Sequence, residues 1–132
     1  MEILLPLCYR ILMPVQVANS VPILVADDDA QDTMLVRLAV ERASLGLQLS
    51  SVKDGEEAID YLLGRSQFAD RHAHPFPKML LLDLKMPRVN GFDVLDFVRQ
   101  QPGLKQLPVV IFSSSDDPKD IQRAYDGGAN SY

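Results

Sequence analysis

The stretch Ile23-Leu24-Val25-Ala26-Asp27-Asp28-Asp29 places four consecutive apolar residues directly before three carboxylates. A short continuous apolar run is typical of a strand that is buried on both faces, as in a parallel sheet. The same arrangement recurs at Met79-Leu80-Leu81-Leu82, which Asp83 follows, and at residues 108–112, which Ser113-Ser114-Ser115 follows. The sequence therefore predicts three buried strands that each end in polar side chains.

The segments between these strands show helical spacing. Residues 30–43 predict a helix that Gly46 would end. Residues 47–52 predict a less continuously apolar strand near a sheet edge. Asp54, with Glu57 three residues further on, predicts the N-cap of a second helix. The positions at helical spacing are Leu35, Leu38, Ala39 and Arg42 in the first helix, and the expected buried stripe of the second is Ala58, Ile59, Leu62 and Leu63.

Two further helices complete the alternation. Residues 91–100 predict one of them. Asp117 before Pro118 predicts the start of the other, because proline at the first helical position loses no hydrogen bond. Gly127-Gly128 would end that helix, and a further strand would begin at the C-terminus. Strands and helices that alternate in this way predict an α/β fold, with a doubly wound parallel sheet and helices on both faces.

Composition limits the classes of protein that fit. The chain has 132 residues, of which 47% are hydrophobic and 23% charged, and this predicts one folded domain rather than a disordered chain. The net charge of −5 shows no basic surplus, so nucleic acid is not an expected partner. One cysteine, Cys8, cannot form an intramolecular disulfide, which favours the cytoplasm. The sequence has no run of about 18 apolar residues free of charge and proline, so a membrane-spanning helix is not expected.

Residues 1–20 form an apolar extension that differs from the domain expected over residues 21–132. Glu2 precedes the apolar residues and Arg10 interrupts them, which disfavours a cleaved secretory signal. Pro6 and Pro14 break any helix there. We expect an extension that packs on the domain or on a second copy, or one that does not belong to the natural chain.

The polar strand ends predict where chemistry takes place, because ligands of such sheets bind at the carboxyl ends of the strands. Two carboxylates about 4 Å apart repel by roughly 4 kcal/mol at an effective dielectric constant of 20. They need a cation, or their pKa values rise. Carboxylate oxygens with open positions for water and phosphate suit Mg²⁺. Asp83 is also a candidate nucleophile, since a carboxylate can form an acyl phosphate.

A simpler interpretation is that Asp27, Asp28 and Asp29 are only cap and turn residues. Asp29 falls where an N-cap is expected. Three carboxylates at one strand end, together with Asp83 at another, exceed what capping needs. We therefore favour metal or phosphate chemistry over a purely structural role.

Several segments, in order, resemble the receiver domains of bacterial response regulators. Residues 23–29 resemble the first strand and acidic pair of that family, and residues 80–87 with Asn90-Gly91 resemble its phosphoacceptor segment. Residues 54–58, 108–114 and 128–132 are similar to the start of its second helix, its fourth strand and the entry to its fifth strand. The resemblance covers about residues 21–132.

The resemblance implies a flavodoxin-like fold with strand order 2-1-3-4-5 and a phosphoacceptor switch rather than an enzyme. Asp83 would receive a phosphoryl group from a histidine kinase. Asp28, Asp83 and the backbone carbonyl of Lys85 would bind Mg²⁺, and Asp27 would act mostly through water. The hydroxyl of Ser113 would bond the phosphoryl group. The remaining implied positions are Ser114, a small residue that leaves access to the site, and Tyr132, the switch aromatic.

Two departures from the family pattern bear on these roles. Ser113 stands where threonine is commoner, so the hydroxyl is kept and the methyl group is lost. The family has a lysine three positions beyond its switch aromatic, and Tyr132 is the last residue given. We therefore expect the fifth strand and fifth helix to be largely missing. Three explanations would account for this: the sequence is a fragment, its ordered part ends here, or a partner completes the fold.

Three functions remain open from the sequence. The leading one is a phosphoaccepting signalling switch whose partner surface lies near the fourth helix. A phosphatase or phosphotransferase would use Asp83 as its nucleophile, but it usually carries a second acid two residues later, where this chain has Lys85. A degenerate receiver would serve only for protein binding. The long loop after the second helix resembles single-domain receivers that partner phytochrome-type kinases. We also expect a homodimer, in which a second copy covers apolar surface.

Overall fold

A parallel four-stranded sheet forms the centre of the molecule. The computed structural model describes residues 20–113 and 116–132. The strands are β1 (Val21–Ala26), β2 (Leu47–Val52), β3 (Met79–Leu82) and β4 (Val109–Ile111), in the order β2-β1-β3-β4. This confirms the parallel sheet, the first four positions of the expected order and the edge position of β2. β4 is shorter than expected, but Pro108 and Phe112 still exchange backbone hydrogen bonds with β3.

Four α-helices connect and follow these strands in the described part of the chain. They are α3 (Ala30–Ala43), α4 (Gly55–Leu63), α5 (Gly91–Gln100) and α6 (Pro118–Asp126), with a short 3₁₀ helix, η1 (Ser66–Phe68), after α4. Each of these four α-helices begins at an N-cap whose side chain accepts a backbone N–H. These caps are Asp29, Asp54, Asn90 and Asp117.

The predicted range of the first helix, residues 30–43, is confirmed, but Gly46 is not the residue that caps its end. The helix ends at Ala43, and Ser44 takes the left-handed conformation (φ 50°) while its N–H donates to the carbonyl of Glu41. Gly46 is also left-handed, at φ 64°, and its carbonyl accepts the N–H of Val21. Ser44 therefore closes the helix, and Gly46 turns the chain into β2 beside the start of β1.

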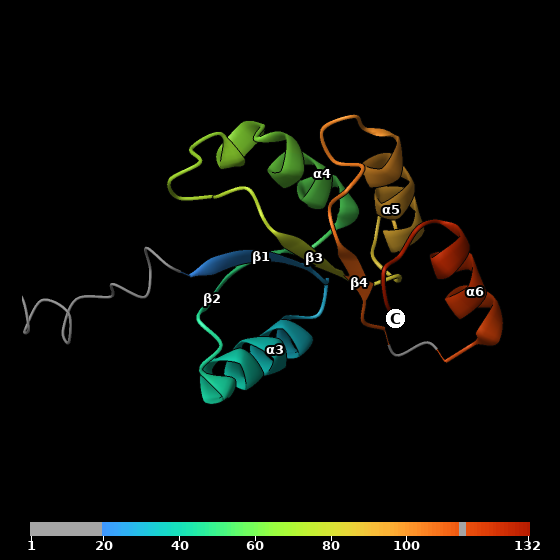
Figure 1. The fold of residues 1–132 in the computed structure, drawn as a ribbon, viewed down its shortest axis with the longest axis horizontal. Helices are drawn as coiled ribbons and strands as arrows, with labels where there is room; N and C mark the ends of the chain where they lie inside the picture. The colour runs from blue at the N-terminus through green and yellow to red at the C-terminus, as the bar shows by residue number, and fades with distance from the viewer. Residues whose placement is uncertain (1–19, 114–115) are drawn as a thin grey trace, which may run out of the picture.

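The helices form two layers around the sheet (Figure 1): α4 and α5 lie over one face, α3 lies over the other, and α6 lies beyond β4. Successive strand residues point to opposite faces. One continuous buried cluster joins the sheet to α4, α5 and α6; its strand members are Leu24, Ala26, Val52, Leu80, Leu82, Val109 and Ile111. Ile23 and Val25 are buried as well, on the other face of β1.

The stripe expected on α4 differs from the observed one. Ala58 and Leu62 are buried as expected, but Ile59 and Leu63 are only half-buried, and Tyr61 is buried instead. The chain after α4 folds back over Tyr61, whose hydroxyl donates to the carbonyl of Pro75 at 3.0 Å. A tyrosine is buried most readily where its hydroxyl finds such a partner.

α3 has no buried residue within the described part of the structure. Leu35 is 64% exposed, and Met34 and Leu38 are 57% and 41% exposed. The helical spacing was predicted correctly, but it did not reveal how little of this helix the rest of the described chain covers.

The C-terminal residues continue the sheet beyond β4. Val110 forms a parallel bridge with Ser131, and the N–H of Ile111 donates to the Ser131 carbonyl. The guanidinium of Arg99 donates to the carbonyls of Gly128, Lys105 and Leu107 and so ties this segment to α5. A further strand thus begins beside β4, where the sequence places it. No helix among the described residues is long and apolar enough to cross a membrane. Residues 1–19, and with them the predicted apolar extension, lie outside the described residues.

Candidate functional site

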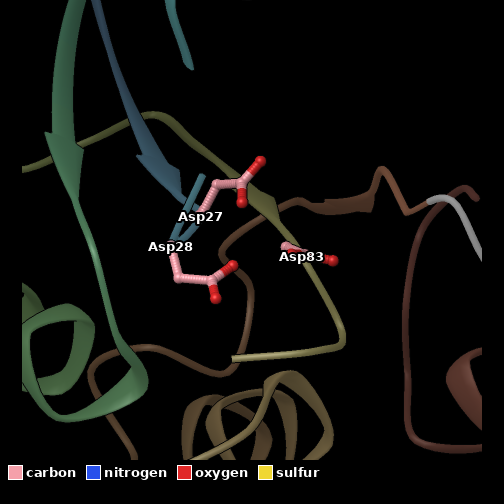
Figure 2. A group of neighbouring side chains, drawn as sticks. All are labelled: Asp27, Asp28 and Asp83. Atoms are coloured by element: carbon pink, nitrogen blue, oxygen red, sulfur yellow. The ribbon is translucent and has the colours of Figure 1, made fainter. Parts of the chain in front are cut away.

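Two adjacent strands bring three carboxylates together. β1 and β3 pair in parallel with Ala26 opposite Leu82, so the next residues, Asp27 and Asp83, leave the sheet side by side. Asp28 follows on the same edge (Figure 2). One carboxylate oxygen from each of Asp27, Asp28 and Asp83 lies within 4.8 Å of the others. This is the convergence that parallel pairing predicts from the sequence.

Asp27 is the buried member of this group, with 3% of its surface exposed. Its Oδ1 accepts the N–H of Asp29 at 2.9 Å, while its Oδ2 is buried with no hydrogen-bond partner among the residues that the structure describes. The pKa of Asp27 is raised to about 7, chiefly by burial; the Asp29 N–H lowers it, and the negative charges of Asp83 and Asp32 add to the increase. A buried carboxylate oxygen without a partner is costly unless a cation or proton occupies the position beside it.

The donor set fits a divalent cation. Three carboxylates supply hard oxygen ligands from a buried, a half-buried and an exposed residue, so several positions stay open to water. Among the described residues, no group donates to the buried Asp27 Oδ2, and a bound cation or its water would supply that partner. Their hard oxygen ligands and open positions make these three carboxylates a site for a divalent cation.

The loop after β3 fixes the position of Asp83. The backbone N–H of Lys85 donates to Asp83 Oδ1 at 3.3 Å, and the N–H of Gly91 donates to the carbonyl of Leu84. A Cβ at Gly91 would collide with the backbone of Asp83 and Leu84, so only glycine permits this approach. Asn90 and Asp93 form a reciprocal capping box that begins α5 directly after the loop.

A cavity of about 390 Å³ adjoins Asp83 on the side of β4. Ser113 lines it, so the structure brings this predicted hydroxyl to the same cavity as the predicted phosphoacceptor. Tyr132 is half-buried and packs against the core. Lys85 is exposed at the end of the loop, and Ser114 lies outside the described residues. Their roles stay predictions.

The sequence interpretation missed Asp32, which lines the same cavity. A signal was present in the sequence, since Asp32 lies in the first turn of the helix that begins just after Asp27, Asp28 and Asp29. An acidic residue in the first helical turn has an ordinary structural explanation, because it complements the helix dipole. The sequence alone therefore did not separate this residue from a common stabilising feature.

The chain is similar in sequence and fold to known proteins. The sequence pattern of the family described as "Response regulator receiver domain" matches residues 23–132. The response regulator RPA3017, from red light signalling of R. palustris, is 40% identical, with a TM-score of 0.79 over 85% of this chain and 78% of its own. The phosphorylated cyanobacterial phytochrome response regulator RcpA is 32% identical, with a TM-score of 0.78 over 86% and 79%. The Mn²⁺-bound form of Rcp1, from Synechocystis, is 30% identical, with a TM-score of 0.76 over 84% and 78%.

The chain belongs to the response regulator receiver domain family. It is a receiver domain of two-component signalling, a phosphoacceptor rather than a conventional enzyme, and its aspartate cluster stands at the position expected for phosphorylation.

Proposed function

We propose that Asp83 accepts a phosphoryl group from a histidine kinase. A carboxylate oxygen of Asp83 bonds to phosphorus as the bond to the donor nitrogen breaks, and the electron pair stays on that nitrogen. The observation that carries the proposal is the meeting of three carboxylates within 4.8 Å, beside a buried Asp27 oxygen that has no hydrogen-bond partner in the described part of the chain. The three carboxylates would repel an incoming anionic phosphoryl group, so phosphotransfer at this site requires a cation that neutralises their charge.

Mg²⁺ is the cation of the proposal, and it would neutralise charge on the phosphoryl oxygens when bound. Asp28, Asp83 and the Lys85 carbonyl would be its direct ligands, and Asp27 would bind through water. The Mn²⁺-bound form of Rcp1 supports a divalent ion in such a site. The depth of Asp27 supports its indirect role, because its exposed fraction is only 3%.

The switching residues of the proposal are Ser113, Ser114 and Tyr132. The hydroxyl of Ser113 would donate to the phosphoryl group, and its place beside Asp83 in one cavity supports this. Tyr132 follows Ser131, which pairs with β4, so a shift of Ser113 after β4 can reach Tyr132 through that strand pair. The surface that changes would be that of α6 and the strand after it.

A phytochrome-type kinase is the proposed partner. The support comes from the relatives: RPA3017 belongs to red light signalling, and RcpA is a phytochrome response regulator. The proposal includes a homodimer, for which the exposed Met34, Leu35 and Leu38 of α3 are the supporting surface. Sedimentation of a stable monomer at high concentration would contradict the dimer without affecting phosphotransfer.

The experiment that tests phosphotransfer is incubation with acetyl phosphate and Mg²⁺, followed by intact mass measurement. The wild-type chain should gain one phosphoryl group, and both EDTA and Asp83→Asn should abolish the gain. Asp96→Asn, the same change at an exposed position on α5, is the matched control and should be phosphorylated like the wild type. A wild-type chain that never gains the phosphoryl group, yet binds the kinase, would indicate a receiver used only for binding. Continuous hydrolysis of phosphate esters would indicate a phosphatase.

A further inference from the structure

Asp32 places a fourth carboxylate beside the cation site. It lies in the first turn of α3 and lines the cavity of about 390 Å³ together with Asp83 and Ser113. The other lining residues, Leu35, Val36 and Phe112, are apolar. Asp32 is not one of the three aspartates whose ligand atoms meet within 4.8 Å, so the proposed cation site does not account for its position.

The carboxylate of Asp32 lies on the wall of the cavity that Asp83 also lines. Asp32 is exposed and Leu35 is 64% exposed, so water partly screens the Asp32 charge, and a group bound to Asp83 feels a partly screened repulsion across the cavity. A phosphoryl group attached to Asp83 and bonded to Ser113 would lie in this cavity and therefore face Asp32.

We infer that Asp32 limits the lifetime of the aspartyl phosphate by repelling the phosphoryl group across this cavity. The inference rests on the proposed function of Asp83. It gives α3 a role in setting how long the phosphorylated state lasts, whereas other residues hold the cation and the phosphoryl group.

The chemistry of hydrolysis gives the direction of the effect. A water oxygen bonds to phosphorus, the phosphorus–oxygen bond to Asp83 breaks, and its electron pair returns to the Asp83 carboxylate. The proton released by water goes to solvent, and inorganic phosphate leaves. In the loose transition state, charge moves from the phosphoryl oxygens toward the departing carboxylate. A negative charge facing the phosphoryl oxygens therefore destabilises the phosphorylated state more than the transition state.

The test compares the decay of the phosphorylated protein in matched variants. Each is phosphorylated with acetyl phosphate and Mg²⁺, the donor is removed, and the remaining phosphoprotein is followed by intact mass. Asp32→Asn should decay roughly fivefold more slowly than the wild type, as expected for a charge acting across a partly screened cavity. Asp32→Glu restores the charge and should decay at nearly the wild-type rate.

Glu41→Gln provides the control for net charge. It removes one negative charge from the same helix, nine residues and about 13 Å further along its axis, and should leave the decay rate unchanged. Added salt should slow decay of the wild type toward that of Asp32→Asn, because screening weakens the repulsion. A merely structural role for Asp32 would not produce this convergence.

The donor supplies a second measurement. Acetyl phosphate carries more negative charge than phosphoramidate at neutral pH, so Asp32→Asn should accelerate phosphorylation by acetyl phosphate more than by phosphoramidate. Equal decay of wild type and Asp32→Asn, with both proteins phosphorylated on Asp83, would overturn the inference and leave the proposed function intact. A wild-type chain that neither donor phosphorylates would overturn both.

Discussion

Replacing Asp27 by asparagine should stabilise the metal-free protein at alkaline pH. The asparagine side chain would keep an oxygen that can accept the N–H of Asp29, and its amide could donate toward Asp83. The change removes the charge whose burial raises the pKa of Asp27 from 3.8 to about 7. The folded wild type holds this proton more tightly than the unfolded chain does, so the contribution of Asp27 to stability is largest below pH 3.8 and falls as pH rises toward 7.

The magnitude follows from the two pKa values. One pKa unit corresponds to about 1.36 kcal/mol, so ionising Asp27 in the metal-free fold costs roughly 4 kcal/mol once the pH exceeds 7. Between pH 5 and pH 8 the wild type should lose roughly 3 kcal/mol of unfolding free energy from this group. Asp27→Asn should not show that loss, because its amide does not titrate in this range.

Urea denaturation in EDTA, at pH 5 and pH 8, measures this difference. The advantage of Asp27→Asn over the wild type should be larger at pH 8 by roughly 3 kcal/mol. Asp96→Asn controls for the loss of one negative charge elsewhere on the surface and should follow the wild type. An advantage of Asp27→Asn that is the same at both pH values would refute the electrostatic account of the buried carboxylate.

Three further predictions concern contacts that hold the site and the fold. Gly91→Ala should destabilise the protein by about 1–3 kcal/mol and lower phosphorylation, because its Cβ would push on the strand end that carries the phosphoacceptor. Gly103→Ala is the control, since a Cβ there meets nothing within 4 Å. Its stability in thermal unfolding and its phosphorylation by intact mass should be unchanged or slightly improved. Tyr61→Phe should lose about 1–2 kcal/mol in urea with its two hydroxyl hydrogen bonds, whereas Tyr125→Phe, 46% exposed, should not differ from wild type. Arg99→Lys should lose about 2 kcal/mol, since one ammonium cannot reach every oxygen that the guanidinium fork contacts, and equal unfolding midpoints would contradict this.

The meeting of Asp27, Asp28 and Asp83 could be predicted from sequence because it depends on few choices. Apolar runs identify the buried strands, and alternation with helices makes the sheet parallel. Parallel strands end on one edge, so acids that follow two neighbouring strands must meet. The helix starts at Asp54 and Asp117 were equally predictable, because capping is a local interaction between a side chain and the next backbone N–H groups.

Other features depend on contacts that sequence spacing does not specify. Tyr61 replaces Ile59 in the buried stripe because a distant carbonyl, that of Pro75, accepts its hydroxyl. The exposure of Leu35 depends on what covers α3, which helical spacing cannot give. The place of Asp32 on the cavity wall depends on the angle at which α3 leaves the sheet, so it was found only in three dimensions.

The most direct test of the account is to locate the phosphoryl group on the chain. The protein is phosphorylated with acetyl phosphate and Mg²⁺, reduced with borohydride, which converts an aspartyl phosphate to homoserine, and cleaved for peptide mass spectrometry. The account predicts homoserine at Asp83 and at no other aspartate, with none formed in EDTA. Homoserine at Asp27 or Asp28, or a stable phosphate ester on Ser113 in place of the acyl phosphate, would contradict it.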